Sequence, residues 1–232
     1  METYDDFTAR ILAFQLDSVP PEPTLGLSPA LSSKVAPATG EFRPFHGDTV
    51  AYFLDDAGSE LVAEVTRDLY ARFAPALSAP IPIATAHVTL HDLRASAELE
   101  SIRAQMESSR PRVEQLVARA RELGPIHTAC TAVFNLVNTS IAIGLAPADE
   151  SEHRKLMQAH ALFDEIVTFA SFTPHITLAY YRPEPPVQLP GGELREQLAG
   201  LSVRVQGEPV LLDPARLFAL RFDSMSNYWQ LG

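Results

Sequence analysis

The sequence predicts an α+β protein built from two similar halves. Strand-like and helix-like segments alternate in the order strand, helix, strand, helix, then strands, helix, strand, helix, strands. In each half, one strand-like segment carries the same short pattern, His-x-Thr-Leu, at residues 87–90 and again at residues 175–178. We therefore expect the two patterns to occupy equivalent places in the two halves.

The composition is that of a soluble globular protein. The 232 residues are enough for one large domain or a two-lobed one, with 46% hydrophobic and 20% charged residues. The formal net charge of −11 argues against binding to duplex DNA or anionic membranes, because such binding needs many spread Lys and Arg side chains. A small phosphate ligand stays compatible with this charge, because a cleft can be locally positive on an acidic protein.

The sequence points to a cytoplasmic protein. Its only cysteine is Cys130, so no disulfide can form within the chain. The N-terminal stretch METYDDFTARILAF is acidic and lacks a long apolar run, so we do not expect a secretory signal. No stretch approaches the length of a membrane span.

The first part of the chain is expected to form a short helix and an arm. Residues 1–16 have a helical pattern, and residues 18–45 are rich in Pro, Ser and Gly. The latter stretch is long for a structureless loop, so we expect it to wrap the body or contribute to a pocket. The expected division is an N-terminal arm over 1–47, partly extended, and a two-lobed domain over 48–232.

The first half continues with strand, helix, strand and helix. Residues 49–54 read as a strand, and residues 56–73 as a helix with apolar residues at four-residue steps. Residues 83–90 read as a strand, and residues 97–123 as a long helix in which Pro111 marks a kink or a break.

The second half begins with two strands, residues 127–137 and 139–147, joined by a turn near Asn138. A helix over 149–168 and a strand over 175–181 follow. A Pro-rich loop and a short helix fill residues 182–200, and residues 201–206 and 209–223 are strand-like.

The repeated pattern places polar groups on one face of a strand. Because side chains alternate along a strand, we expect His87, Thr89 and His91 to share a face opposite the apolar residues. His175, Thr177 and Tyr181 share a face in the same way. Seven histidines would produce about 0.1 matches to this pattern by chance, so two matches in strand-like surroundings indicate a function.

Paired His and Thr side chains suit chemistry at phosphorus. One imidazole can take a proton from water or a hydroxyl while the other gives a proton to the leaving oxygen. The Thr hydroxyls can donate hydrogen bonds to the non-bridging oxygens of a phosphate. In-line displacement needs groups on opposite sides of the phosphorus, which two strands from two lobes can supply.

The two motifs, His87-Val88-Thr89-Leu90 and His175-Ile176-Thr177-Leu178, lie 88 residues apart. In these two motifs and in their separation, the sequence resembles the two-histidine (2H) phosphoesterase superfamily, which includes RNA cyclic phosphodiesterases and 2'-5' RNA ligase-like proteins. The resemblance covers roughly residues 48–222. Within it, TVAYFL, FNLVNTSIAIGL and LFALRFDSMSNY look like bacterial 2'-5' RNA ligase-like proteins.

The resemblance implies a bilobal, pseudo-twofold fold, with two antiparallel β-sheets lining a central cleft and helices packed outside. It implies hydrolysis of a 2',3'-cyclic phosphate or a 2'-5' phosphodiester of a nucleotide or short RNA, without a metal or another cofactor. His87 and His175 would be the acid–base pair, and Thr89 and Thr177 the phosphate binders. Which histidine is the acid stays open.

Three further residues have weaker signals. On the expected cleft faces, His91 is a candidate for contact with the substrate base or sugar, or else a rim histidine bonded to Asp92 or solvent. Tyr181 is a candidate for base stacking, or else a packing residue. Tyr228, near the C-terminus, is expected to pack against the body, with substrate stacking as the alternative.

Two other functions compete with the phosphodiesterase. A nucleotide- or RNA-binding module on the same fold would show no turnover, although a pure binder has no need for two imidazoles. A metal hydrolase would use His87 and His91, which have the i, i+4 zinc spacing of a helix. On a strand, however, these residues lie about 13 Å apart, so we expect no metal there. The sequence does not indicate an oligomeric state.

Overall fold

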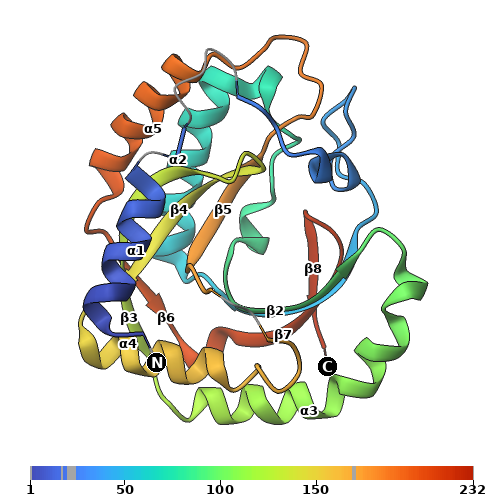
Figure 1. Cartoon of the computed structure of the whole chain (residues 1–232), viewed down its shortest axis with the longest axis vertical. Coiled ribbons are helices and arrows are strands. Elements are labelled where there is room, and N and C mark those ends of the chain that lie inside the picture. The colour runs from blue at the N-terminus through green and yellow to red at the C-terminus, as the bar shows by residue number, and fades with distance from the viewer. Residues whose placement is uncertain (1, 17, 20–24, 169–170, 232) are drawn as a thin grey trace.

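The strands of the computed structural model form one curled antiparallel sheet, with the helices packed around its outer side (Figure 1). The structure describes residues 2–16, 18–19, 25–168 and 171–231. Among them the sheet has eight strands in the order β6-β3-β4-β5-β2-β1-β7-β8. The predicted α+β class is confirmed.

The strands are β1 His46–Phe53, β2 His87–Ser96, β3 Ile126–Leu136, β4 Ser140–Pro147, β5 His175–Tyr180, β6 Pro209–Leu212, β7 Leu217–Ser224 and β8 Asn227–Gln230. The α-helices are α1 Tyr4–Leu16, α2 Asp56–Phe73, α3 Arg103–Arg121, α4 Glu150–Ala161 and α5 Gly191–Val205. No helix in the described part of the chain is long and apolar enough to cross a membrane.

The two halves meet at the centre of the sheet, where β2 and β5 lie side by side. On one side lie β2, β1, β7 and β8, and on the other β5, β4, β3 and β6. The halves are joined at the Val88–Ile176 pair. The two sheets expected from the resemblance are therefore one continuous sheet with a narrow seam. Val88 and Ile176 hold the same place in the two motifs, so the pseudo-twofold axis passes between them.

Local sequence explains why the predicted elements form. Helix α2 starts where the Asp55 side chain accepts a hydrogen bond from the Gly58 amide at 2.8 Å, and it buries Val65, Leu69 and Phe73 on one face. The β3–β4 turn contains Asn138 with φ of 59°, a left-handed conformation that Asn tolerates better than most residues. The predicted turn is confirmed.

Several predicted elements differ from the structure. The strand predicted over 83–90 begins with a 3-10 turn at Ile83–Thr85, and the strand predicted over 209–223 is divided by a 3-10 turn at Pro214–Arg216. Residues 201–206, predicted as a strand, belong mainly to helix α5, which buries Leu194, Leu198, Leu201 and Val205 at helical spacing. Residues 97–123 form a short 3-10 turn and then helix α3, which continues through Pro111. The helix predicted over 149–168 ends at Ala161 and gives way to turns.

The N-terminal segment packs on the second half of the sheet. In Figure 1, α1 lies beside β3 and β4. Gly144 of β4 makes room for it, because a Cβ there would lie 2.1 Å from Gln15 Nε2 and 2.6 Å from Thr131 Oγ1. The chain then forms the 3-10 turn Pro29–Ser33 before entering β1. The division at residues 47 and 48 stays a prediction.

Candidate active site

A cleft of about 410 Å³ lies over the seam between the two halves, and both motifs line it. His87, Thr89, His175 and Thr177 all contribute to its wall, and each is half-buried. The sequence predicted this convergence. The register explains it, because pairing Val88 with Ile176 sets His87 across from Thr177 and Thr89 across from His175.

Both cleft histidines are held by the same local hydrogen bond. His87 Nδ1 lies 2.7 Å from the Thr85 carbonyl oxygen, and His175 Nδ1 lies 2.8 Å from the Thr173 carbonyl oxygen. A carbonyl oxygen can only accept, so the hydrogen of each ring sits on Nδ1. In the neutral form, Nε2 of each ring therefore carries the lone pair that a general base needs.

The reactive atoms of the four side chains are available to a ligand. No described residue makes a hydrogen bond to either Nε2 atom or to the hydroxyl of Thr89 or Thr177. Burial lowers the pKa of both His87 and His175, and the Asp92 carboxylate opposes this effect on each. The charge of one imidazole also disfavours protonation of the other, which lowers the pKa of His87 further.

Two β-bulges change the face that follows each motif. Opposite neighbouring residues of β1, strand β2 has an extra residue at Leu90, and opposite neighbouring residues of β4, strand β5 has an extra residue at Leu178. A bulge inserts one residue and so reverses the alternation beyond it. Both motifs thus end on the bulged leucine, a symmetry that simple alternation did not predict.

The bulges correct the expectations for His91 and Tyr181. His91 turns away from the cleft and is 1% exposed, with Nε2 3.3 Å from Asp164 Oδ1. Tyr181 is fully buried and donates its hydroxyl hydrogen to Asn135 Oδ1 at 3.0 Å. Neither residue lines the cleft.

The immediate neighbours of His91 and Tyr181 in the sequence face the cleft instead. Asp92, five residues after His87, and Tyr180, five residues after His175, both line the cleft. The two positions are equivalent in the two halves, so the pseudosymmetric site carries an acidic group on one side and a phenol on the other. The Tyr180 hydroxyl donates to Met225 Sδ at 3.2 Å.

The N-terminal arm contributes Lys34 and Phe45 to the cleft. Lys34 Nζ lies 5.0 Å from the Phe45 ring centre and 5.7 Å from that of Tyr180. Burial lowers the pKa of Lys34, and the Asp92 carboxylate across the cleft opposes this effect. Among the described residues, no carboxylate forms an ion pair with this ammonium group.

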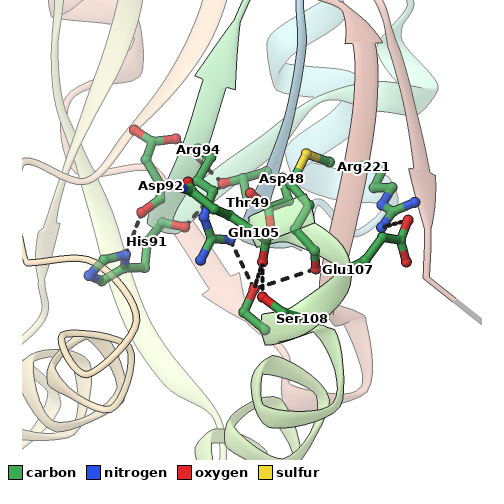
Figure 2. A network of polar contacts seen from close by, with 11 residues as sticks. Asp48, Thr49, His91, Asp92, Arg94, Gln105, Glu107, Ser108 and Arg221 are labelled. Carbon is green, nitrogen blue, oxygen red and sulfur yellow. Dashed lines mark hydrogen bonds and ion pairs between the residues drawn. The ribbon is translucent and has the colours of Figure 1, made fainter. Parts of the chain in front are cut away.

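The other cation in the cleft wall, Arg94, is already neutralised. Its Nη1 donates to Asp48 Oδ2 at 3.1 Å and to Ser109 Oγ at 2.9 Å. Figure 2 shows Arg94 and Asp48 beside helix α3, and it also shows the His91 and Asp92 side chains pointing in different directions. Of these two cations, Lys34 is therefore the better placed to meet an anionic ligand.

An aromatic wall closes the first-half side of the cleft. The Tyr228 ring centre lies 4.7 Å from that of His87 and 5.2 Å from that of Phe222. All three rings line the cleft. Tyr228 therefore packs against the body, as expected, and presents its ring next to the first motif.

Helix α1 supports the second motif. Arg10 donates to the Phe172 carbonyl oxygen at 3.0 Å and contacts Thr173 Oγ1 at 3.4 Å, while Glu2 holds the guanidinium from the other side. The Thr173 carbonyl in turn fixes the His175 ring. Arg10 therefore anchors the segment that immediately precedes His175.

Sequence reasoning missed Lys34, Phe45, Asp92 and Tyr180. The bulges that expose Asp92 and Tyr180 have no mark in the sequence except the leucine that ends both motifs. The arm residues carry no pattern that ties them to either motif. One signal was present: both motifs are preceded by Thr-x, in Thr85-Ala86-His87 and Thr173-Pro174-His175, and the carbonyls of these Thr residues orient the rings.

Comparison with solved structures shows the fold. A conserved protein of unknown function from Agrobacterium tumefaciens, ATU0111, aligns over 93% of this chain and 97% of its own, with 17% identity and a TM-score of 0.61. Escherichia coli LigT in its apo form aligns over 81% and 95%, with 16% identity and a TM-score of 0.44. TT0787 of Thermus thermophilus aligns over 79% and 97%, with 18% identity and a TM-score of 0.46. No family model and no curated protein matches the sequence.

The chain thus shares its α+β fold with the ATU0111 protein. At these identities the likeness extends to the fold, and TM-scores below 0.5 add no weight to it.

Proposed function

We propose that the protein is a metal-independent phosphodiesterase of the two-histidine type. The observation that carries this proposal is the arrangement of the cleft: two imidazoles with free Nε2 atoms and two free Thr hydroxyls, related by the seam at Val88 and Ile176. Such a set can place an acid and a base on opposite sides of one phosphorus atom.

The proposed reaction is the hydrolysis of a cyclic phosphate of the 2',3' type or of a 2'-5' phosphodiester. One imidazole takes a proton from water as the water oxygen bonds to phosphorus. The other gives a proton to the ribose oxygen as its bond to phosphorus breaks. The two Thr hydroxyls donate to the non-bridging oxygens, where negative charge develops. The two rings exchange roles as acid and base over the turnover, and which one starts as the base is left open.

The cleft supplies no ligand set for a catalytic metal. Within the described residues, one group of three side chains has the spacing to hold an ion, and it lies outside the cleft. The chemistry is therefore assigned to the imidazoles and hydroxyls.

The dimensions of the cleft favour a small substrate. Its volume of about 410 Å³ falls in the range of small-molecule sites, roughly 300–1,000 Å³. Phe45, Tyr180 and Tyr228 offer rings against which a base can stack, and each stacked base contributes about 1–3 kcal/mol. We infer a nucleotide or short oligonucleotide as the substrate.

Lys34 suggests that the substrate carries a second anionic group. The two Thr hydroxyls and two imidazoles already surround one phosphate. An ammonium group that is partly buried without a carboxylate partner gains most from an anion placed beside it. A nucleotide with a terminal phosphate, or an oligonucleotide with a neighbouring phosphodiester, meets this requirement.

The proposal is tested with the wild-type protein and a His87→Ala/His175→Ala double variant. Both are incubated with 2',3'-cyclic mononucleotides, 2'-5' dinucleotides and cyclic dinucleotides in the presence of EDTA, and products are read by mass spectrometry. A His127→Ala variant is the control, because His127 is exposed on β3 away from the cleft. We expect turnover by the wild type and the control only.

Other outcomes separate the alternatives. Equal turnover by the double variant would remove the two-histidine mechanism. Binding of a nucleotide by calorimetry, without product after long incubation, would favour a nucleotide- or RNA-binding module on the same fold.

A further inference from the structure

His91, His160 and Asp164 form a polar cluster behind the cleft. His91 comes from β2, His160 from the end of α4, and Asp164 from the turns after α4. One nitrogen or oxygen atom of each lies within 4.8 Å of the others. His91 and His160 are 1% and 6% exposed, while the Asp164 side chain is 40% exposed and connects the cluster to solvent.

The hydrogen bond of His91 fixes where its proton lies. His91 Nδ1 is 2.6 Å from the Asp92 carbonyl oxygen, which can only accept, so Nδ1 carries the hydrogen. Nε2 of the neutral ring then presents a lone pair to Asp164 Oδ1 at 3.3 Å. Two lone pairs at this distance repel each other unless a cation lies between them. This cation is either a second proton on His91 or a metal ion.

His160 distinguishes these two choices. Its ring centre lies 4.5 Å from that of His91, and no described residue makes a hydrogen bond to its ring nitrogens. A proton on His91 Nε2 would satisfy Asp164 and leave the His160 ring, 6% exposed, with no hydrogen bond to a described residue. A metal ion satisfies all three side chains together.

The spacing and surroundings also fit a metal. Two ligands at about 2.0–2.1 Å from a tetrahedral zinc ion lie about 3.3–3.4 Å apart, close to the observed separation of Nε2 and Oδ1. A backbone carbonyl that accepts from the other ring nitrogen is the usual support of a metal-binding histidine. The Phe163 and Phe172 rings flank the two imidazoles at 5.9 Å and 4.5 Å and limit the access of water.

We propose that His91, His160 and Asp164 bind one divalent metal ion, for which zinc is the best match to two imidazole nitrogens and one carboxylate oxygen. The ion ties the end of α4 to β2 immediately beside Asp92. Its role is structural: it holds the part of β2 in which the bulge turns His91 outward and Asp92 into the cleft. None of its ligands lines the cleft, so zinc binding can be measured whether or not the protein hydrolyses phosphodiesters.

The test measures zinc binding to the full chain without an affinity tag. Zinc content of the purified protein is measured by mass spectrometry, and the protein is then stripped with a chelator and titrated with zinc by calorimetry. Asp164→Asn removes one ligand with almost no change in shape. Its matched control is Glu165→Gln, which removes a neighbouring exposed carboxylate that pairs with Arg112. We expect one zinc per chain, at least roughly tenfold weaker binding in Asp164→Asn, and unchanged binding in Glu165→Gln.

A second variant and a spectrum keep the test decisive if Asp164→Asn is poorly folded. Cobalt(II) bound to the wild type is expected to give visible absorption bands that His160→Gln loses and His127→Gln keeps. Nitrogen-15 NMR reports the state of His91 directly: zinc leaves Nε2 without a hydrogen. Zinc affinity unchanged in both ligand variants would overturn the proposal. A His91 ring protonated on both nitrogens in the presence of zinc would overturn it too, in favour of a plain ion pair with Asp164.

Discussion

Lys34 provides a sharp test of the proposed substrate class. Its ammonium group lines the cleft between the Phe45 and Tyr180 rings, and no carboxylate of the described residues pairs with it. Lys34→Met removes the charge and keeps most of the side-chain volume. If the ammonium binds a second phosphate, this change removes one charge-assisted contact while the two motifs stay intact.

The size of the effect follows from that contact. A hydrogen bond to a charged group contributes about 1.5–3 kcal/mol. At 1.4 kcal/mol for each factor of ten, kcat/KM should fall roughly 10- to 150-fold for a substrate with a second phosphate. The contact forms in both the ground state and the transition state, so we expect the loss mainly in KM. A substrate with only the reacting phosphate should lose little.

The assay compares 2',3'-cyclic nucleotides with and without a 5'-phosphate, at low and high salt. Arg43→Met is the matched control, because Arg43 also belongs to the arm but donates to the Ser32 carbonyl oxygen and does not line the cleft. If Lys34→Met lowers kcat/KM equally for both substrates, or for neither, the ammonium group does not bind a second anion and the substrate inference fails.

Three further predictions concern the histidines and their support. Burial lowers the pKa of His87 and His175, so kcat/KM should peak below pH 6.5 and fall as the pH rises through the higher pKa of the pair. A peak above pH 7.5 in a pH–rate profile would contradict this. Arg10→Met should lower kcat about tenfold with little change in KM, since it frees the Phe172 carbonyl and the Thr173 hydroxyl just before His175, and Arg10→Lys should restore part of the loss in steady-state assays. Gly144→Ala should cost about 1–3 kcal/mol of unfolding free energy in urea, because its Cβ would meet Gln15; an unchanged midpoint would show that α1 is not seated there.

The sequence was sufficient for the fold class and for the four central residues. Hydrophobic periodicity found α2, and Asn138 marked the β3–β4 turn. The repeated motif placed His87 and His175 in the same cleft because both strands are central in the sheet. These features depend on local pattern and on pairing, which the residues carry directly.

Which residues face the cleft after each motif depends on irregularities of the backbone. Strict alternation predicts His91 and Tyr181 on the cleft face, but the bulges at Leu90 and Leu178 replace them with Asp92 and Tyr180. A bulge is a property of two paired strands, and neither strand alone reveals it.

Residues 201–206 show a second kind of limit. Their β-branched residues favour a strand by local propensity. The chain follows helical spacing instead, because Leu201 and Val205 continue the apolar face that Leu194 and Leu198 begin. Tertiary packing decided between the two patterns.

The segment before residue 48 has a consequence for how the protein can diversify. Lys34 reaches the cleft from this segment, and Arg10 holds the strand that bears His175, yet neither belongs to the repeated halves. Changes in the arm can therefore redirect the protein toward other ligands while the His-x-Thr-Leu strands stay the same. For the same reason, a chain that starts at residue 48 would retain both motifs and lose the Lys34 ammonium group in the cleft and the Arg10 contacts just before His175.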